Sequence, residues 1–217
     1  MNSPEASLNP DWFHFPRCIG RIEKPTTIQI KPDLVGFGGQ RLMIIAHPTQ
    51  SGAFQLRCAF WTPRPLAEVF EFFANAGNLQ ELTPQFLNFH VVTPCPIAMH
   101  VGSTIDYRLR MHGFPMKWRS LISAWEPPFR FVDEQVQGPY SFWHHEHTFE
   151  ERDGGTLIHD MVDYGVPGGW LIHALFVKRD LTSIFDYRTQ MMQQRFGGHV
   201  IDPSNSREGM ATGEWSR

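Results

Sequence analysis

The chain has 217 residues, a formal net charge of −3 at pH 7 and 41% hydrophobic residues. This length fits one domain with a sizeable core, and a slightly negative chain without a basic run excludes nucleic acid as its main partner. The longest aliphatic run, Leu42 to Ala46, is too short to span a bilayer, so no membrane insertion is expected.

The cysteines Cys18, Cys58 and Cys95 are odd in number and lack the spacing of a metal site. A reducing compartment suits such a set better than a secreted location, and we expect a cytoplasmic protein. No sequence feature calls for a cofactor.

Residues 1–50 predict an irregular N-terminal extension and not a domain. Prolines and a glycine-rich break at Gly36, Gly38 and Gly39 interrupt every potential element. Aromatic residues such as Trp12 and Phe13 are hydrophobic enough to dock on a neighbouring surface. One hypothesis therefore treats the extension as the docking element of a protein-interaction module whose partner is unknown.

The next segment predicts one strand followed by two short helices. Apolar and polar residues alternate from Phe54 to Trp61, as in a half-buried strand. Pro65 suits the first turn of a helix, and apolar residues follow it at helical spacing as far as Phe73. A second short helix, 79–82, ends before Pro84.

From residue 86 to residue 164 the sequence predicts successive antiparallel strands with turn residues between them. The expected strands span residues 86–92, 105–111, 116–125, 129–136, 140–150 and 156–164. Asp153-Gly154 is the signature of a tight hairpin between the last two. Such a series predicts a curved antiparallel meander.

A long helix closes the pattern between Gly168-Gly169 and Gly197-Gly198. The intervening segment lacks Gly and Pro, and apolar residues recur at steps of four and three. The expected apolar stripe contains Trp170, Ala174, Val177, Leu181, Ile184 and Met191, widened by Leu171, Leu175, Phe185 and Met192. Residues 199–217 are polar and aperiodic, and we expect a disordered tail there.

The order of elements and three local sequences resemble the START-like, or SRPBCC, superfamily, in its bacterial polyketide cyclase/dehydrase-like branch. The sequences are Asn78 to Pro84, Trp125 to Phe131 and Gly155 to Leu157. The resemblance implies an α+β helix-grip fold over residues 51–198. About seven strands would form a curved antiparallel sheet wrapped around the long C-terminal helix, with two short helices after the first strand.

The resemblance also implies a cavity between the sheet and the helix, and a strongly bent sheet under one helix agrees with it. Aromatic side chains either line this space or fill the core. The residues expected to bind a ligand are Trp118, Trp143, His145, His147, Phe149, Asp160, Tyr164 and Trp170.

Counting back from the Asp153-Gly154 turn aligns the last two strands. His147 then lies opposite Asp160, and His145 shares the face of His147 among aromatic residues. Three interpretations of His145, His147 and Asp160 remain open: a metal site, an acid–base pair, or a buried polar network that fixes the register. The metal site lacks an obvious further ligand, so no metal is expected.

The function favoured by these patterns is binding of a small hydrophobic or amphipathic molecule in the cavity. The alternative is an enzyme of the cyclase, dehydratase or isomerase type, with His145, His147 and Asp160 as candidate catalytic residues for proton transfer.

Overall fold

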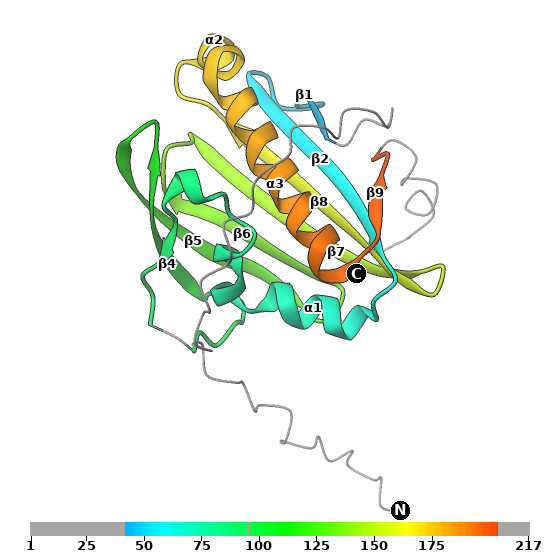
Figure 1. The fold of residues 1–217 in the computed structure, drawn as a ribbon. Helices are drawn as coiled ribbons and strands as arrows, with labels where there is room; N and C mark the ends of the chain where they lie inside the picture. The colour runs from blue at the N-terminus through cyan, green and yellow to red at the C-terminus, as the bar shows by residue number, and fades with distance from the viewer. Residues whose placement is uncertain (1–41, 95, 204–217) are drawn as a thin grey trace, which may run out of the picture.

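The computed structural model describes residues 42–94 and 96–203 as one curved sheet that packs against a long helix (Figure 1). Most of the expected N-terminal extension, Cys18, Cys95 and most of the expected tail lie outside the described residues. The sheet has nine strands in the order β1-β2-β8-β7-β6-β5-β4-β3, with β9 also pairing to β2. This arrangement is the predicted α+β helix-grip fold.

The strands alternate with short turns, as the sequence predicts. Their bounds are β1 Met43–Ala46, β2 Ala53–Thr62, β3 His90–Val91, β4 Thr104–Met111, β5 Phe114–Glu126, β6 Arg130–Gln137, β7 Phe142–Arg152, β8 Gly155–Gly165 and β9 His199–Ile201. Every strand pair is antiparallel. Asp153 and Gly154 both have positive φ, of 51° and 73°, as the two central residues of a type I′ turn require.

The short helices after β2 differ in detail from the prediction. Helix α1, Leu66–Ala74, is confirmed, and a 3₁₀ helix η1, Ala76–Gln80, follows it directly. A further 3₁₀ turn η2, Gln85–Leu87, and a left-handed Asn88 occupy much of the strand expected at residues 86–92, leaving only the two residues of β3. Pro84 and the positive φ of Asn88 are incompatible with a longer strand there.

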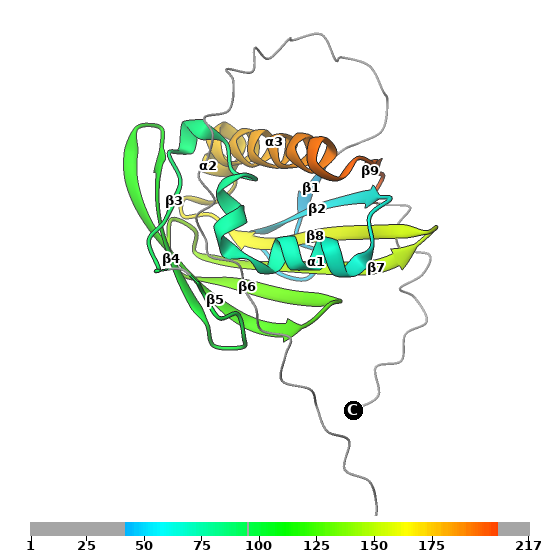
Figure 2. The same cartoon turned by 60° about the horizontal axis from the view of Figure 1, so that its bottom comes forward.

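The long helix contains three consecutive segments: α2 Gly169–Ile172, a π-helical turn η3 His173–Val177 and α3 Lys178–Phe196. Figure 2 shows α3 lying along one face of the curved sheet. Its buried side chains Leu181, Phe185, Met192 and Phe196 pack against strands β2, β7 and β8. No helix in the described part of the chain is long and apolar enough to cross a membrane.

The expected apolar stripe is correct for α3 and wrong for the first two turns of the helix. Trp170, Leu171 and Leu175 are exposed, with Trp170 at 73%. A π-helical turn holds more residues than an α-helical turn, so positions before it rotate relative to positions after it. His173 is the residue that this rotation buries, and Nε2 of His173 lies 3.0 Å from the Tyr164 hydroxyl.

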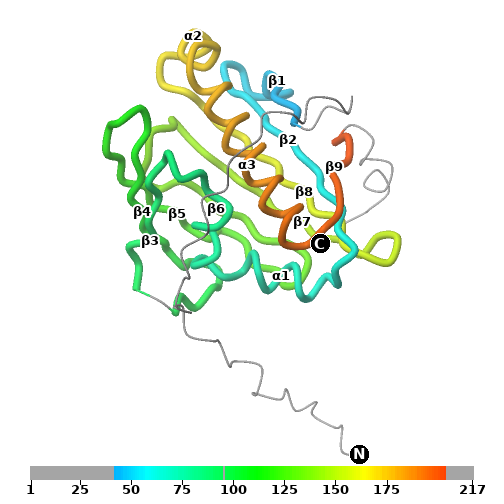
Figure 3. Tube along the Cα trace, in the orientation of Figure 1, coloured from blue at the N-terminus to red at the C-terminus, as the bar shows by residue number. Residues whose placement is uncertain are grey.

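Two segments that lie outside the expected domain of residues 51–198 pair with strands of the sheet. Strand β1 pairs with Phe54–Arg57 of β2, and β9 pairs with Ala59–Trp61 of the same strand. Figure 3 shows β9 beside β2 at the C-terminal end of α3. Both strands are only a few residues long, and short edge strands carry little periodicity in the sequence.

Candidate ligand-binding site

A cavity of about 200 Å³ lies between the sheet and the helices, where the sequence predicts one. Most of its wall is apolar because β4, β5 and β6 alternate inward apolar residues with outward polar ones, and because α3 presents the apolar stripe of its buried face. Helix α1 and the 3₁₀ segment η1 close another side. The apolar wall includes Phe72, Leu79, Leu109, Trp118, Ile122 and Leu181.

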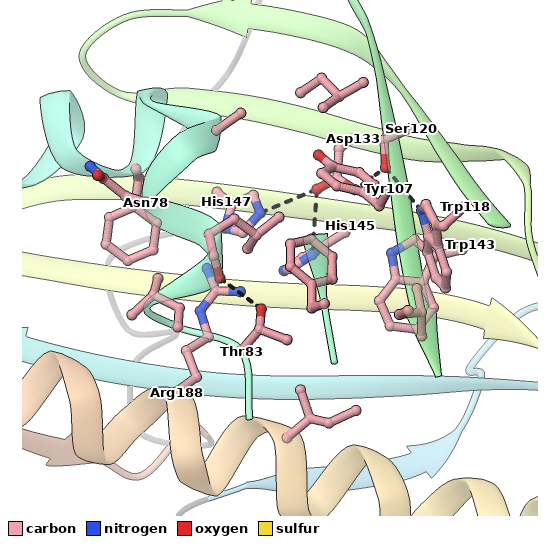
Figure 4. Close-up of a pocket in the computed structure, with 18 of the residues that line it drawn as sticks. Asn78, Thr83, Tyr107, Trp118, Ser120, Asp133, Trp143, His145, His147 and Arg188 are labelled. Atoms are coloured by element: carbon pink, nitrogen blue, oxygen red, sulfur yellow. Dashed lines mark hydrogen bonds and ion pairs between the residues drawn. The ribbon is translucent and has the colours of Figure 1, made fainter. Parts of the chain in front are cut away.

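A row of polar side chains crosses the apolar wall from one strand to the next. Ser120 lies on β5, Asp133 on β6, His145 and His147 on β7, and Asp160 on β8. The register pairs Asp133 with His145 and His147 with Asp160. Figure 4 shows the Asp133 carboxylate between the two imidazoles, with His145 and His147 both turned towards it.

Each imidazole lies between two carboxylates. Oδ2 of Asp133 is 3.5 Å from Nδ1 of His145 and 3.4 Å from Nε2 of His147. On the other side, Oδ1 of Asp160 is 3.3 Å from Nε2 of His145 and 2.6 Å from Nδ1 of His147. The 2.6 Å contact is an ion pair and not an aligned hydrogen bond, since Nδ1 of His147 has no partner in line with its N–H.

The two histidines differ in their affinity for a proton. Burial lowers the pKa of His145 to about 4, and the charge of His147 adds to this effect. Burial acts in the same direction on His147, but the carboxylates of Asp160 and Asp133 outweigh it and raise its pKa. Although burial opposes the charge of both acids, the nearby cations hold the pKa of Asp133 and Asp160 below the usual range.

Arg188 of α3 supplies a second cation to the row. It is 7% exposed, lines the cavity, and its Nε lies 3.5 Å from Oδ2 of Asp160. The guanidinium also contacts the rings of Phe73 and Phe185, at 5.3 and 5.9 Å from the ring centres. With His147 charged, two cations balance the two carboxylates, which a dry interior requires.

At the other end of the row, Ser120 connects the polar side chains to the aromatic wall. Nε1 of Trp118 donates a hydrogen bond to Oγ of Ser120 at 3.0 Å, and this hydroxyl donates to Oδ1 of Asp133 at 3.4 Å. Trp118 also packs edge-on against Trp143. The polar row thus begins in the aromatic part of the cavity wall and ends at Arg188.

The structure brings together four of the eight residues predicted to bind a ligand. Trp118, Trp143, His145 and His147 line the cavity. Asp160 lies behind the histidines, while Phe149 and Tyr164 are buried in the core to either side. Trp170 is exposed and does not line the cavity, because the π-helical turn η3 rotates the residues before it away from the sheet.

Asp133 and Arg188 are the two charged residues of the row that the sequence prediction missed. Both left a signal: Asp133 follows Phe131 by two residues, so the alternation that buries Phe131 also turns Asp133 inward. Arg188 falls three residues after Phe185 and four before Met192, inside the apolar stripe. An arginine in such a stripe indicates a buried acidic partner.

A family model described as polyketide cyclase/dehydrase and lipid transport matches residues 62–192 of this chain, more than half of its length. This segment runs from the end of β2 to the fourth turn of α3 and contains the whole polar row. A comparison with curated proteins found no match.

Solved structures support the fold. A Chromobacterium violaceum protein has a TM-score of 0.53 and 13% identity, covering 67% of this chain and 99% of its own. A Mycobacterium smegmatis protein has a TM-score of 0.51 and 13% identity, with coverages of 70% and 94%. A Rhodobacter sphaeroides protein has a TM-score of 0.50 and 14% identity, with coverages of 70% and 96%. At these identities the similarity establishes the fold alone.

Proposed function

The chain belongs to the polyketide cyclase/dehydrase and lipid-transport family, and from this membership we propose that it binds one small amphipathic molecule in the cavity between the sheet and α3. The observation that supports this proposal is the divided wall of the cavity. Apolar side chains cover most of it, and a few convergent polar groups occupy one side. Small-ligand sites in proteins usually have this composition.

The apolar body of the ligand would lie against the wall formed by Leu109, Ile122 and Trp118. Burial of apolar surface drives such binding at roughly 25 cal/mol per Å². Trp118 and Trp143 pack edge-on against each other, and both line the cavity. A rigid ring system should bind this wall better than a flexible chain, which loses more conformational freedom when it is ordered.

The polar end of the ligand would face Arg188. The guanidinium of this residue has five N–H donors, and the structure records one polar contact for it, with Asp160. Its remaining donors favour a carbonyl, enolate or carboxylate oxygen on the ligand. Such a charge-assisted hydrogen bond contributes about 1.5–3 kcal/mol, which corresponds to roughly 10–100-fold in affinity.

Displacement of the fluorescent probe N-phenyl-1-naphthylamine tests the cavity. Leu109→Trp fills it from β4 and should weaken probe binding by at least about tenfold. Val136→Trp is the matched control, because Val136 is 59% exposed and lies outside the cavity wall. Equal probe affinity in the wild type and Leu109→Trp would refute binding in this cavity.

A matched pair of competitors tests the polar end. The competitors 1-naphthoic acid and 1-methylnaphthalene share one ring system and differ in the carboxylate. The acid should displace the probe at lower concentration from the wild type, and Arg188→Gln should remove this preference while the hydrocarbon still competes. A preference for the hydrocarbon in the wild type would contradict the assignment of Arg188.

A second candidate is an enzyme that moves a proton on the bound molecule, as in cyclisation, dehydration or isomerisation. The favouring observation is that His147 lines the cavity and contacts two carboxylates, which raise its pKa. The test is exchange of the α-hydrogens of a bound aryl ketone in deuterated water. His147→Gln should abolish the catalysed exchange, whereas His144→Gln, on the outer face of β7, should retain it.

A further inference from the structure

The contacts around His145 and His147 place unprotonated ring nitrogens against carboxylate oxygens. All four imidazole nitrogens face a carboxylate oxygen, at distances from 2.6 to 3.5 Å. A neutral imidazole has only one N–H, and its second nitrogen carries a lone pair. Two neutral imidazoles therefore turn two lone pairs towards carboxylates. A third N–H, on a charged His147, still leaves one such repulsive contact.

A cation between the histidines and Asp133 removes this repulsion. One ring nitrogen of His145, one of His147 and a carboxylate oxygen of Asp133 lie within 4.8 Å of one another. The ring nitrogens that face Asp133 are Nδ1 of His145 and Nε2 of His147. We propose that these three side chains bind one divalent transition-metal ion. No metal was expected from the sequence because an obvious further ligand was missing, and Asp133 on the neighbouring strand supplies one.

The separations of the Asp133 oxygen from the two imidazole nitrogens match those in a tetrahedral site. Zinc binds imidazole nitrogen and carboxylate oxygen at about 2.0–2.2 Å, so two ligands at a tetrahedral angle lie roughly 3.4 Å apart. The two distances from Oδ2 of Asp133 are 3.4 and 3.5 Å. Both exceed an ordinary N–H···O hydrogen bond of about 2.9 Å. Two imidazoles and one carboxylate with an open position suit Zn²⁺, and the same ligand set also suits Fe²⁺.

In many metal sites a carboxylate contacts the ring nitrogen of a metal-bound histidine that points away from the ion, and Asp160 has this position. Its Oδ1 contacts the nitrogen of each ring that points away from Asp133. An acceptor at this place holds the ring of His145 so that Nδ1 presents its lone pair to the ion, whereas its contact with Nδ1 of His147 is not an aligned hydrogen bond. Arg188 contacts Oδ2 of the same carboxylate and offsets part of its charge.

The site is open on one side, because Asp133, His145 and His147 all line the cavity. Three protein ligands with a fourth position facing a cavity are the arrangement of reactive zinc sites, in contrast to closed structural ones. The fourth position would take water or an oxygen atom of a bound molecule. The metal site stands on its own geometry and does not depend on the identity of that molecule.

The test is titration of the tag-free, full-length, chelator-treated protein with Zn²⁺, followed by calorimetry, and with Co²⁺, followed by visible absorption. We expect one ion per chain and the strong absorption bands of four-coordinate Co²⁺. His145→Gln and His147→Gln should each weaken binding by more than about 100-fold, and Asp160→Asn by about 10–100-fold.

His144→Gln is the matched control, since His144 lies on the same strand, faces away from the cavity and contacts Glu134. Its affinity for Zn²⁺ should equal that of the wild type. The proposal is overturned if the wild type binds no ion, or if His144→Gln reduces binding as much as His145→Gln does. The Co²⁺ spectrum of the wild-type protein tests the proposal without any substitution. A folding defect in a variant therefore does not affect this result.

Discussion

At the scale of single residues, Asp160 has the most partners in the polar row. It contacts His145, His147, Arg188 and the thiol of Cys58, and it is 2% exposed. Burial alone would keep such an acid protonated, but Arg188 and His147 lower its pKa well below the usual range. Asp160 is therefore ionised in the folded state, where its charge balances the positive charges of Arg188 and of a protonated His147.

Asp160→Asn should destabilise the metal-free protein strongly, because it leaves Arg188 without its buried counter-charge. Removal of one partner from a buried pair costs about 3–5 kcal/mol in the free energy of unfolding. Urea denaturation followed by circular dichroism in the presence of a chelator measures this cost. Asp106→Asn is the control: Asp106 pairs with Arg119 at the surface, and its loss should be much smaller. Equal losses would contradict the buried pair.

Sequence reasoning was strongest where one turn fixes the geometry. The Asp153-Gly154 turn places His147 opposite Asp160, and the observed register confirms this pairing. Asp133 and Arg188 reach the same point from another hairpin and from α3, and local counting does not connect separate elements. The register of β5 against β6 also shifts between Ile122 and Ala124, and sequence alternation does not reveal such a bulge.

At the scale of elements, the long helix is divided by the π-helical turn η3. Residues after it bury the stripe that begins at Leu181, whereas Trp170 and Ile172 before it and Phe176 within it are exposed. The apolar spacing is similar on both sides of the turn, which is why the sequence predicted one continuous stripe. A change of helical phase is a property of the backbone and leaves no mark on hydrophobic periodicity.

Two leucines of this helix give a matched comparison. Leu181→Ala should lower the free energy of unfolding by about 2–5 kcal/mol, since Leu181 is 2% exposed and packs in the core. Leu175→Ala, at a site 57% exposed, should change it by less than about 0.5 kcal/mol. Thermal and urea unfolding of both variants measure the difference. A large effect of Leu175→Ala would mean that the first turns of the helix are covered.

At the scale of the whole molecule, β2 connects the two outermost described segments of the chain. Strand β1 pairs along the first part of β2, and β9 pairs along the second part. The other edge of β2 pairs with β8 over its full length. Together β1 and β9 cover backbone groups of β2 that would otherwise be free to pair with another molecule.

A chain of residues 51–198 should therefore be less stable than one of residues 42–203. The shorter chain lacks β1 and β9 and exposes an edge of β2, so it should also associate at high concentration. Urea midpoints and light scattering compare the two, with the full-length protein as reference. Equal midpoints and equal scattering would show that the edge strands contribute little.

The same pairing has a consequence during synthesis, because the strands leave the ribosome in chain order. Ribosomes release β2 early, yet its long partner β8 follows about a hundred residues later and β9 later still. Contacts between segments so distant in sequence form slowly, because a long loop must close before they stabilise the chain. During synthesis β2 has only the short β1 as a partner. The nascent chain therefore carries an incompletely paired, largely apolar strand until the end of the domain emerges, which is the period when a chaperone would have most to protect.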